Sequence, residues 1–271
     1  EEIRSFYKKK IIYYISPQVW AWKKSRVYDI RKYVDKMMVI LPFEKEFYAR
    51  YNYNVDFVGH PLIDVVNKTS LYQNDENFRL TNNLSDKPII ALLPGSRKQE
   101  ISRMLPVMTS ITEKYPGYEF VIAGAPSIDI TYYQQFPGLE GKKILFGMTH
   151  ELLRYAYAAL VTSGTATLET ALFKIPQVVC YEGSAISFAI ARKIVDVKFI
   201  SLVNLIMDRQ VVTELIQQDF NAINLDKELK NVLDQKNRVR IINDYELLQE
   251  KLGGPGASVR AAELIRLMFN A

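Results

Sequence analysis

Apolar positions between residues 88 and 220 fall into short blocks, each followed by a stretch with helical spacing. The blocks lie at 88–93, 119–123, 143–146, 158–162 and 177–181, and they predict β-strands. The stretches between them predict helices that begin near Gln99, Ile128, Thr149, Thr165 and Ser184. This alternation is typical of a parallel sheet with helices on both faces, so we expect a Rossmann-like, doubly wound α/β domain.

The first 60 residues repeat the alternation on a smaller scale. Blocks at 10–15, 37–41 and 55–58 predict three strands. The apolar residues between them recur every three or four positions and predict two helices, on Val27, Ile30, Val34 and Met37, then on Phe43, Phe47 and Tyr51. Three strands make only half of a doubly wound sheet. We therefore expect residues 1–61 to be the C-terminal part of an N-terminal Rossmann-like domain that is incomplete in this chain.

The rest of the chain supplies the other boundaries. Residues 62–87 are polar and Asn-rich, as in a connection between domains, and residues from 225 onward read as mostly helical. A Gly-Gly-Pro-Gly break at 253–256 precedes a last amphipathic helix at 258–269. We predict a second Rossmann-like domain over 62–250. Residues 251–271 would form a helix that returns to the first domain or to a partner subunit.

Charge is distributed unevenly along the chain. Residues 1–60 carry 12 Lys and Arg against 7 Asp and Glu, while the remaining residues are balanced. This excess favours an anionic partner, such as a phosphorylated ligand, nucleic acid or an acidic membrane surface, although a solvated helix face would look the same. No apolar run approaches the roughly 20 residues of a membrane-spanning helix.

Cysteine and histidine are scarce. The single cysteine, Cys180, lies in an apolar run and is interpreted as a buried structural thiol. The two histidines, His60 and His150, are interpreted as a hinge residue and a surface residue in a first helical turn. With so few ligands a zinc site of the usual kind cannot be assembled, and no Walker-type lysine loop is present. We expect neither a metal nor another cofactor.

Two loops carry the clearest chemistry. Residues 94–97, Pro-Gly-Ser-Arg, follow the first strand of the second domain, and residues 163–166, Ser-Gly-Thr-Ala, follow the fourth. Arg97 offers a planar fork for phosphate oxygens, and Ser163 is predicted to cap the helix after the second loop. Both loops leave the carboxyl edge of one sheet, so we expect them to face a single nucleotide diphosphate.

Further groups would complete such a site. Glu169 falls about one turn inside the helix that follows Ser163, where a carboxylate can accept hydrogen bonds from two vicinal ribose hydroxyls. Gly147 and Met148, at the end of the third predicted strand, could present backbone groups to a base edge.

Several motifs in this order resemble one family, lipid-A-disaccharide synthase, a glycosyltransferase of the two-Rossmann-domain (GT-B) type. They are Ser-Pro-Gln-Val-Trp-Ala-Trp at 16–22, Leu-Pro-Phe-Glu at 41–44, Val-Gly-His-Pro at 58–61, Leu-Pro-Gly-Ser-Arg at 93–97, Ser-Gly-Thr-Ala-Thr-Leu-Glu at 163–169 and Ser-Leu-Val-Asn-Leu at 201–205. The resemblance covers nearly the whole chain. It implies a metal-independent, inverting hexosyltransferase of lipid A and lipopolysaccharide biosynthesis in a Gram-negative bacterium.

The implied reaction joins UDP-2,3-diacylglucosamine to the 6-hydroxyl of 2,3-diacylglucosamine 1-phosphate and releases UDP. Arg97 would be the catalytic residue, because it can stabilise the departing diphosphate. The donor-binding residues would be Gly95, Ser96, Arg97, Gly147, Met148, Ser163, Gly164, Thr165, Ala166, Glu169 and Asn204. The family's glycine-rich first turn and its candidate base aspartate are not in this chain, so we expect weak UDP binding without turnover.

The resemblance also implies a place in the cell: cytoplasmic, and peripheral on the inner face of the inner membrane. Trp20, Trp22, Lys23 and Lys24 suit docking at an anionic bilayer, and residues 186–195 are a second candidate segment. The family exchanges C-terminal elements between subunits, which is consistent with a homodimer built through residues 258–269.

Other interpretations share part of this pattern. Another UDP-sugar enzyme of GT-B fold, such as a 2-epimerase or a murein-precursor transferase, would use the same diphosphate loops but would not explain Trp-Ala-Trp at 20–22. A non-catalytic nucleotide-binding module would fit the incomplete first domain. A nucleic-acid partner is not expected, because the chain carries no recognised module for one.

Overall fold

The protein divides into two compact units, which are described separately. The structure, a computed structural model, describes residues 10–69, 75–183 and 198–270. Within these ranges the first unit comprises residues 10–67 and 248–270, and the second comprises 68–69, 75–183 and 198–247.

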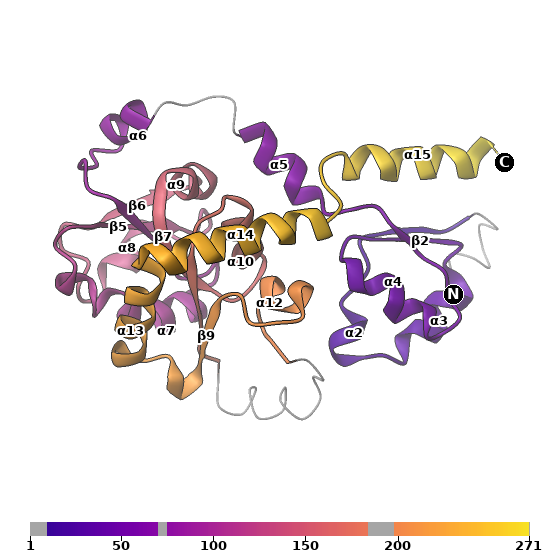
Figure 1. Cartoon of the computed structure of the whole chain (residues 1–271), viewed down its shortest axis with the longest axis horizontal. Coiled ribbons are helices and arrows are strands. Elements are labelled where there is room, and N and C mark those ends of the chain that lie inside the picture. The colour runs from indigo at the N-terminus through magenta and orange to yellow at the C-terminus, as the bar shows by residue number, and fades with distance from the viewer. Residues whose placement is uncertain (1–9, 70–74, 184–197, 271) are drawn as a thin grey trace. The chain divides into compact units, whose positions relative to one another are not determined.

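The second unit contains a six-stranded parallel sheet. Its strands are β4 (Ile89–Leu93), β5 (Glu119–Gly124), β6 (Lys143–Phe146), β7 (Ala156–Thr162), β8 (Gln177–Tyr181) and β9 (Thr213–Ile216). They are arranged in the order β6-β5-β4-β7-β8-β9, and every neighbouring pair is parallel (Figure 1). This is the order of a doubly wound Rossmann sheet, so the predicted fold class is confirmed. Strand β9 was not predicted.

Helices precede, connect and follow these strands. They are α6 (Asp75–Thr81), α7 (Lys98–Thr109), α8 (Ile130–Gln134), α9 (Thr149–Tyr155), α10 (Thr165–Leu172), α12 (Leu202–Met207), α13 (Ala222–Leu233) and α14 (Gln235–Lys251), with 3-10 turns at Thr112–Lys114 and Gln217–Asp219. The starts of α7, α9 and α10 match the predicted ones to within a residue, and α8 begins two residues later than expected. The helix predicted from Ser184 lies outside the described residues.

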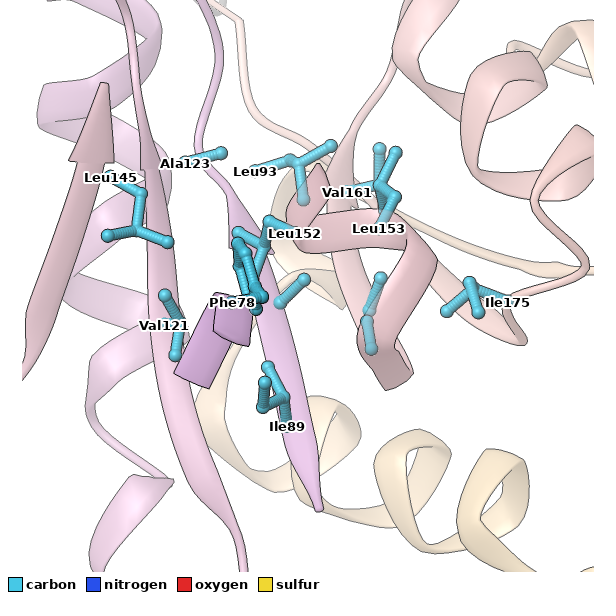
Figure 2. Packing of buried hydrophobic residues seen from close by; sticks show 13 residues of the cluster. Phe78, Ile89, Leu93, Val121, Ala123, Leu145, Leu152, Leu153, Val161 and Ile175 are labelled. Carbon is cyan, nitrogen blue, oxygen red and sulfur yellow. The ribbon is translucent and has the colours of Figure 1, made fainter. Parts of the chain in front are cut away.

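Alternate residues of the central strands build the core of this unit. Ile89 and Leu93 of β4 lie on the same face of the sheet as Val121 of β5. Phe78 of α6 and Leu152 of α9 cover this face (Figure 2). Ile90 and Leu92 are fully buried too, and they point to the opposite face because side chains alternate along a strand. Figure 1 shows α7 and α13 on the side of the sheet opposite α9. A sheet covered on both faces explains why its strands are continuous apolar runs.

Cys180 lies on β8 within this sheet. Its side chain is fully buried, and burial raises the pKa of its thiol. A thiol that stays protonated and enclosed is a packing group, which agrees with its interpretation as a structural residue.

The first unit has a three-stranded parallel sheet in the order β1-β2-β3. Its strands are β1 (Ile12–Tyr14), β2 (Lys36–Val39) and β3 (Asp56–Phe57), and its helices are α2 (Val19–Trp22), α3 (Arg26–Tyr33), α4 (Pro42–Ala49), α5 (Pro61–Thr69) and α15 (Ala257–Asn270). The helix predicted to reach Met37 ends at Tyr33, because Met37 pairs with Tyr13 in the sheet. On α15, Ala261 packs with Met38 and Val58.

The predicted membrane-facing cluster is partly wrong. Trp20 is 8% exposed, and its ring packs edge-on against Phe43 with the centroids 4.9 Å apart. An indole held in a core cannot insert into a bilayer, whereas Lys23 and Lys24 are exposed. The side chain of Trp22 and the second candidate segment, 186–195, lie outside the described residues. In the described part of the chain, no helix combines the length and apolarity required to cross a membrane.

Candidate functional site

The site lies where the strand order of the second unit reverses. β4 and β7 are neighbours at the centre of the sheet, and the connections after them lead to opposite edges, which leaves a crevice at their carboxyl ends. A pocket of about 380 Å³ occupies this position. It is lined by Leu93, Gly95, Ser96, Arg97, Glu100, Ala123, Gly124, Ala125, Pro126, Thr149, Thr162, Ser163, Gly164, Thr165, Ala166 and Glu169. The structure therefore brings both predicted loops to one pocket.

The first loop is held by Glu100, a residue that the sequence did not single out. Oε2 of Glu100 accepts hydrogen bonds from the backbone N–H groups of Ser96, at 2.9 Å, and Arg97, at 3.2 Å. Oε1 accepts from the Arg97 guanidinium at 3.2 Å. Gly95 has a φ of +110°, and a Cβ there would lie 2.6 Å from Oε2 of Glu100. Glycine is required here both by the backbone and by the close approach of this carboxylate.

Arg97 is the cation of the pocket wall. Its side chain is 80% exposed, and its contact with Glu100 engages one nitrogen of the guanidinium. A guanidinium presents five donors in a planar fork, so donors remain for an anionic ligand. An accessible fork at the edge of a concave site is suited to phosphate oxygens.

The second loop begins α10 differently from the prediction. Ser163 does not cap the helix: its hydroxyl donates to the carbonyl of Ile200 at 3.1 Å, and Gly164 is the N-cap residue. Gly164 has no side chain to bind the first N–H groups of α10, and nothing lies within 4 Å of its Cβ position. The start of α10 is therefore open to the pocket. The N–H groups and the helix dipole favour an anion there.

Glu169 lies on the same helix and lines the pocket. Its Oε2 is 3.6 Å from Nε2 of His150, a residue that was interpreted as an ordinary surface histidine. The Glu169 carboxylate beside it raises the pKa of His150, the nearby charge of Glu151 adds to this, and partial burial opposes it. His150 is thus a partner of a predicted site residue.

Residues 123–126 and Thr162 complete the pocket and were also missed. Gly124 ends β5, Ala125 and Pro126 follow it, and the hydroxyl of Tyr133 accepts the N–H of Ala125 at 2.8 Å. Residues 123–126 could have been predicted from the sequence, because the turn after β5 leaves the same edge of the sheet as the two predicted loops. Thr162 ends β7, and its buried hydroxyl finds no hydrogen-bond partner among the described residues.

Gly147, Met148 and Asn204 are the predicted residues that do not line this pocket. Met148 is the N-cap residue of α9 and packs against the apolar core. The amide of Asn204 is fully buried and is engaged in the structure itself: it donates to the carbonyl of Val212 and accepts from the N–H groups of Val211 and Val212. These contacts give Asn204 a structural role, and its predicted role toward a donor stays a prediction.

The described residues include no cluster of three or more His, Cys, Asp or Glu arranged to hold a metal ion. What the pocket does offer is one accessible guanidinium, an uncapped helix start and a carboxylate backed by a histidine. This combination can hold an anion at one end and a hydroxylated group at the other.

Comparisons with known proteins agree on a family. A family model described as lipid-A-disaccharide synthetase matches residues 1–268. The lipid-A-disaccharide synthase of Syntrophus aciditrophicus is 43% identical over 260 residues, which cover 93% of this chain and 67% of that protein. The enzyme of the same name from Coxiella burnetii is 36% identical and is matched over 96% of this chain and 70% of its own length.

A solved structure shows the same architecture. It is titled as a co-structure of S. aureus MnaA with UDP, and it superposes with a TM-score of 0.61 at 13% identity, covering 99% of this chain and 78% of that one. At this identity the likeness concerns the fold alone.

Proposed function

The chain belongs to the lipid-A-disaccharide synthase family, and from this premise we propose that its pocket binds the UDP part of a UDP-2,3-diacylglucosamine donor. The observation that carries the proposal is the meeting of two loops, 94–97 and 163–166, at the switch point of one Rossmann sheet. The alternatives of a 2-epimerase, a murein-precursor transferase or a non-catalytic module are not favoured by the family match.

The diphosphate is assigned to the cationic end of the pocket. Arg97 supplies an accessible guanidinium, and the backbone N–H groups at the start of α10 supply fixed dipoles. The N–H groups are held by the helix before the ligand arrives, so they cost little reorganisation when charge develops. Glu169 would then accept hydrogen bonds from the ribose hydroxyls, as acidic residues do in other Rossmann folds.

The complete reaction is the one that the family match supports. The 6-hydroxyl of 2,3-diacylglucosamine 1-phosphate attacks the anomeric carbon of the donor, and the bond from that carbon to the diphosphate breaks with inversion. UDP departs with the electron pair, and Arg97 together with the start of α10 stabilises its new negative charge. The products are lipid A disaccharide 1-phosphate and UDP. The base that takes the hydroxyl proton is not assigned to a residue of this chain.

Substitution of Arg97 by alanine tests the site directly. We expect Arg97→Ala to weaken UDP binding about 30-fold, since a hydrogen bond to a charged group contributes about 2 kcal/mol. Titration calorimetry with UDP measures this. The matched control is Arg103→Ala, which removes an arginine within α7 that does not line the pocket. Equal affinity of the wild type for ADP, or no loss in Arg97→Ala, would contradict the assignment.

We also propose that the acylated substrates are met at an anionic membrane surface on the cytoplasmic side. The exposed Lys23 and Lys24 are the groups that support this proposal, now without Trp20. Co-sedimentation should show binding to vesicles with anionic lipid and loss of that binding in Lys23→Glu/Lys24→Glu. Equal binding to neutral vesicles would overturn the electrostatic version. The predicted homodimer stays a prediction, which light scattering can check.

A further inference from the structure

His150 and Glu169 come from different helices and meet beside the pocket. His150 is in the first turn of α9, and Glu169 is in the second turn of α10. Their Nε2 and Oε2 atoms lie 3.6 Å apart, with 27% of the His150 side chain and 20% of the Glu169 side chain exposed. The His150 ring also lies 5.5 Å from the ring of Phe173, one helical turn beyond Glu169. The imidazole is thus held against α10 by a polar and an apolar contact.

This contact restrains the Glu169 carboxylate on the side of Oε2. A carboxylate has two oxygens that can each accept more than one hydrogen bond, and an unrestrained glutamate explores several rotamers. Oε2 is the oxygen that lies beside the imidazole, and Glu169 lines the pocket, so Oε1 can accept from a ligand there. That arrangement is suited to two neighbouring hydroxyl groups, because a diol can donate to both oxygens of one carboxylate.

We propose that His150 is a positioning residue that orients the Glu169 carboxylate for the vicinal hydroxyls of the donor ribose. The proposal rests on the UDP site proposed above and extends it to a residue that touches Glu169 rather than the ligand. The protonated imidazole is the stronger partner, because its positive charge attracts the carboxylate across the 3.6 Å contact. The acidic groups that act on His150 are Glu169 on α10 and Glu151 on its own helix.

Two ligands isolate the ribose contact. UDP and 2′,3′-dideoxy-UDP carry the same base and diphosphate and differ only in the two hydroxyls. The ratio of their dissociation constants reports the diol contact, and titration of the diphosphate cancels from it. We expect wild-type protein to prefer UDP about tenfold, and His150→Ala to lower that preference about fivefold. Glu169→Gln should lower it as far or further.

Dependence on pH separates positioning from simple packing. The pKa of His150 is raised, so its contribution is present at low pH and lost as the pH rises through that value. The preference of the wild type for UDP should therefore fall between pH 6 and pH 9. In His150→Gln, which keeps a donor but cannot be charged, it should be independent of pH. Glu151→Gln is the matched control, because it removes a neighbouring charge without removing the contact.

Each outcome decides a separate point. A reduced preference in His150→Ala, with the pH dependence lost in His150→Gln, supports the proposal. A preference that falls in Glu169→Gln but not in either His150 variant overturns the role of His150 and leaves the UDP site standing. No preference in the wild type, or no UDP binding at all, overturns the ribose assignment and this inference with it. Both ligands are measured on the same sample, so partial unfolding of a variant does not change the ratio.

Discussion

Two glutamates begin helices in the same way in the two units of the protein. In the first unit, Oε2 of Glu44 accepts from the N–H groups of Ile40, at 3.3 Å, and Leu41, at 2.9 Å. In the second unit, Glu100 makes the same pair of bonds to the two residues that precede α7. Each glutamate is the third residue of its helix and satisfies backbone donors that the helix leaves free.

The surroundings of the two carboxylates differ. The residue Glu44 is 1% exposed, and burial raises its pKa to about 7 against the opposing effect of the two N–H groups. The Glu100 side chain is 33% exposed and lines the pocket. It also forms an ion pair with the Arg97 guanidinium. The local motif therefore decides where a helix begins, while burial decides what the carboxylate can do. Glu44 begins a helix inside the core, whereas Glu100 begins a helix at the proposed anion site.

Replacement of Glu44 should have the larger effect. Its raised pKa means that the folded protein holds a proton which the unfolded chain releases near the ordinary value of 4.5. The stability that it contributes is fully present below about pH 4.5 and is lost as the pH rises through about 7. Relative to Glu44→Gln, the wild type should lose about 2 kcal/mol of unfolding free energy between pH 5 and pH 8, at about 1.4 kcal/mol per pKa unit.

Tryptophan fluorescence during urea unfolding measures the stability of the unit that contains Glu44, because both tryptophans, at 20 and 22, belong to that first unit. Glu46→Gln is the matched control, since it removes an exposed charge from the same helix. If the unfolding free energies of the wild type and of Glu44→Gln change by the same amount between pH 5 and pH 8, the buried carboxyl does not titrate in this range.

Much of the fold was predictable because its strands, the buried central ones above all, are continuous apolar runs. The bounds of β6 and β8 match the predicted blocks, and an apolar run flanked by turn residues is a strong strand signal. β9 was missed because its four residues, Thr-Glu-Leu-Ile, begin with two polar residues. The other edge strand, β6, has the same burial but reads Lys-Ile-Leu-Phe, and its three consecutive apolar residues gave the signal that β9 lacks.

The only parts of the site that could be predicted were the loops that a doubly wound sheet places at its ligand-binding edge. The loops after β4 and β7 could be placed because a doubly wound sheet has one switch point. Partners that depend on tertiary contacts could not: Ser163 bonds to Ile200, 37 positions later, and His150 reaches across to another helix. Glu100 is an exception, because a glutamate three residues after the N-cap residue Arg97 is a local signal.

Glu100 gives the smaller and more specific prediction. Glu100→Gln keeps an oxygen that can accept from the N–H groups of Ser96 and Arg97, so the loop should stay in place. It removes a negative charge from the pocket that a diphosphate must enter, and it frees the Arg97 guanidinium from its partner. We expect UDP to bind about threefold more tightly, which corresponds to the roughly 0.6 kcal/mol typical of a partly exposed ion pair.

Calorimetry with UDP and with uridine tests this expectation, because uridine carries no phosphate and its affinity should not change. The gain for UDP should also shrink at high ionic strength, where exposed charges are screened. Weaker UDP binding in Glu100→Gln would remove the difference between Glu100 and Glu44. It would mean that the second glutamate, too, acts mainly as a support, holding Arg97 in the orientation that the diphosphate requires, and that the repulsion between the two anions is the lesser effect.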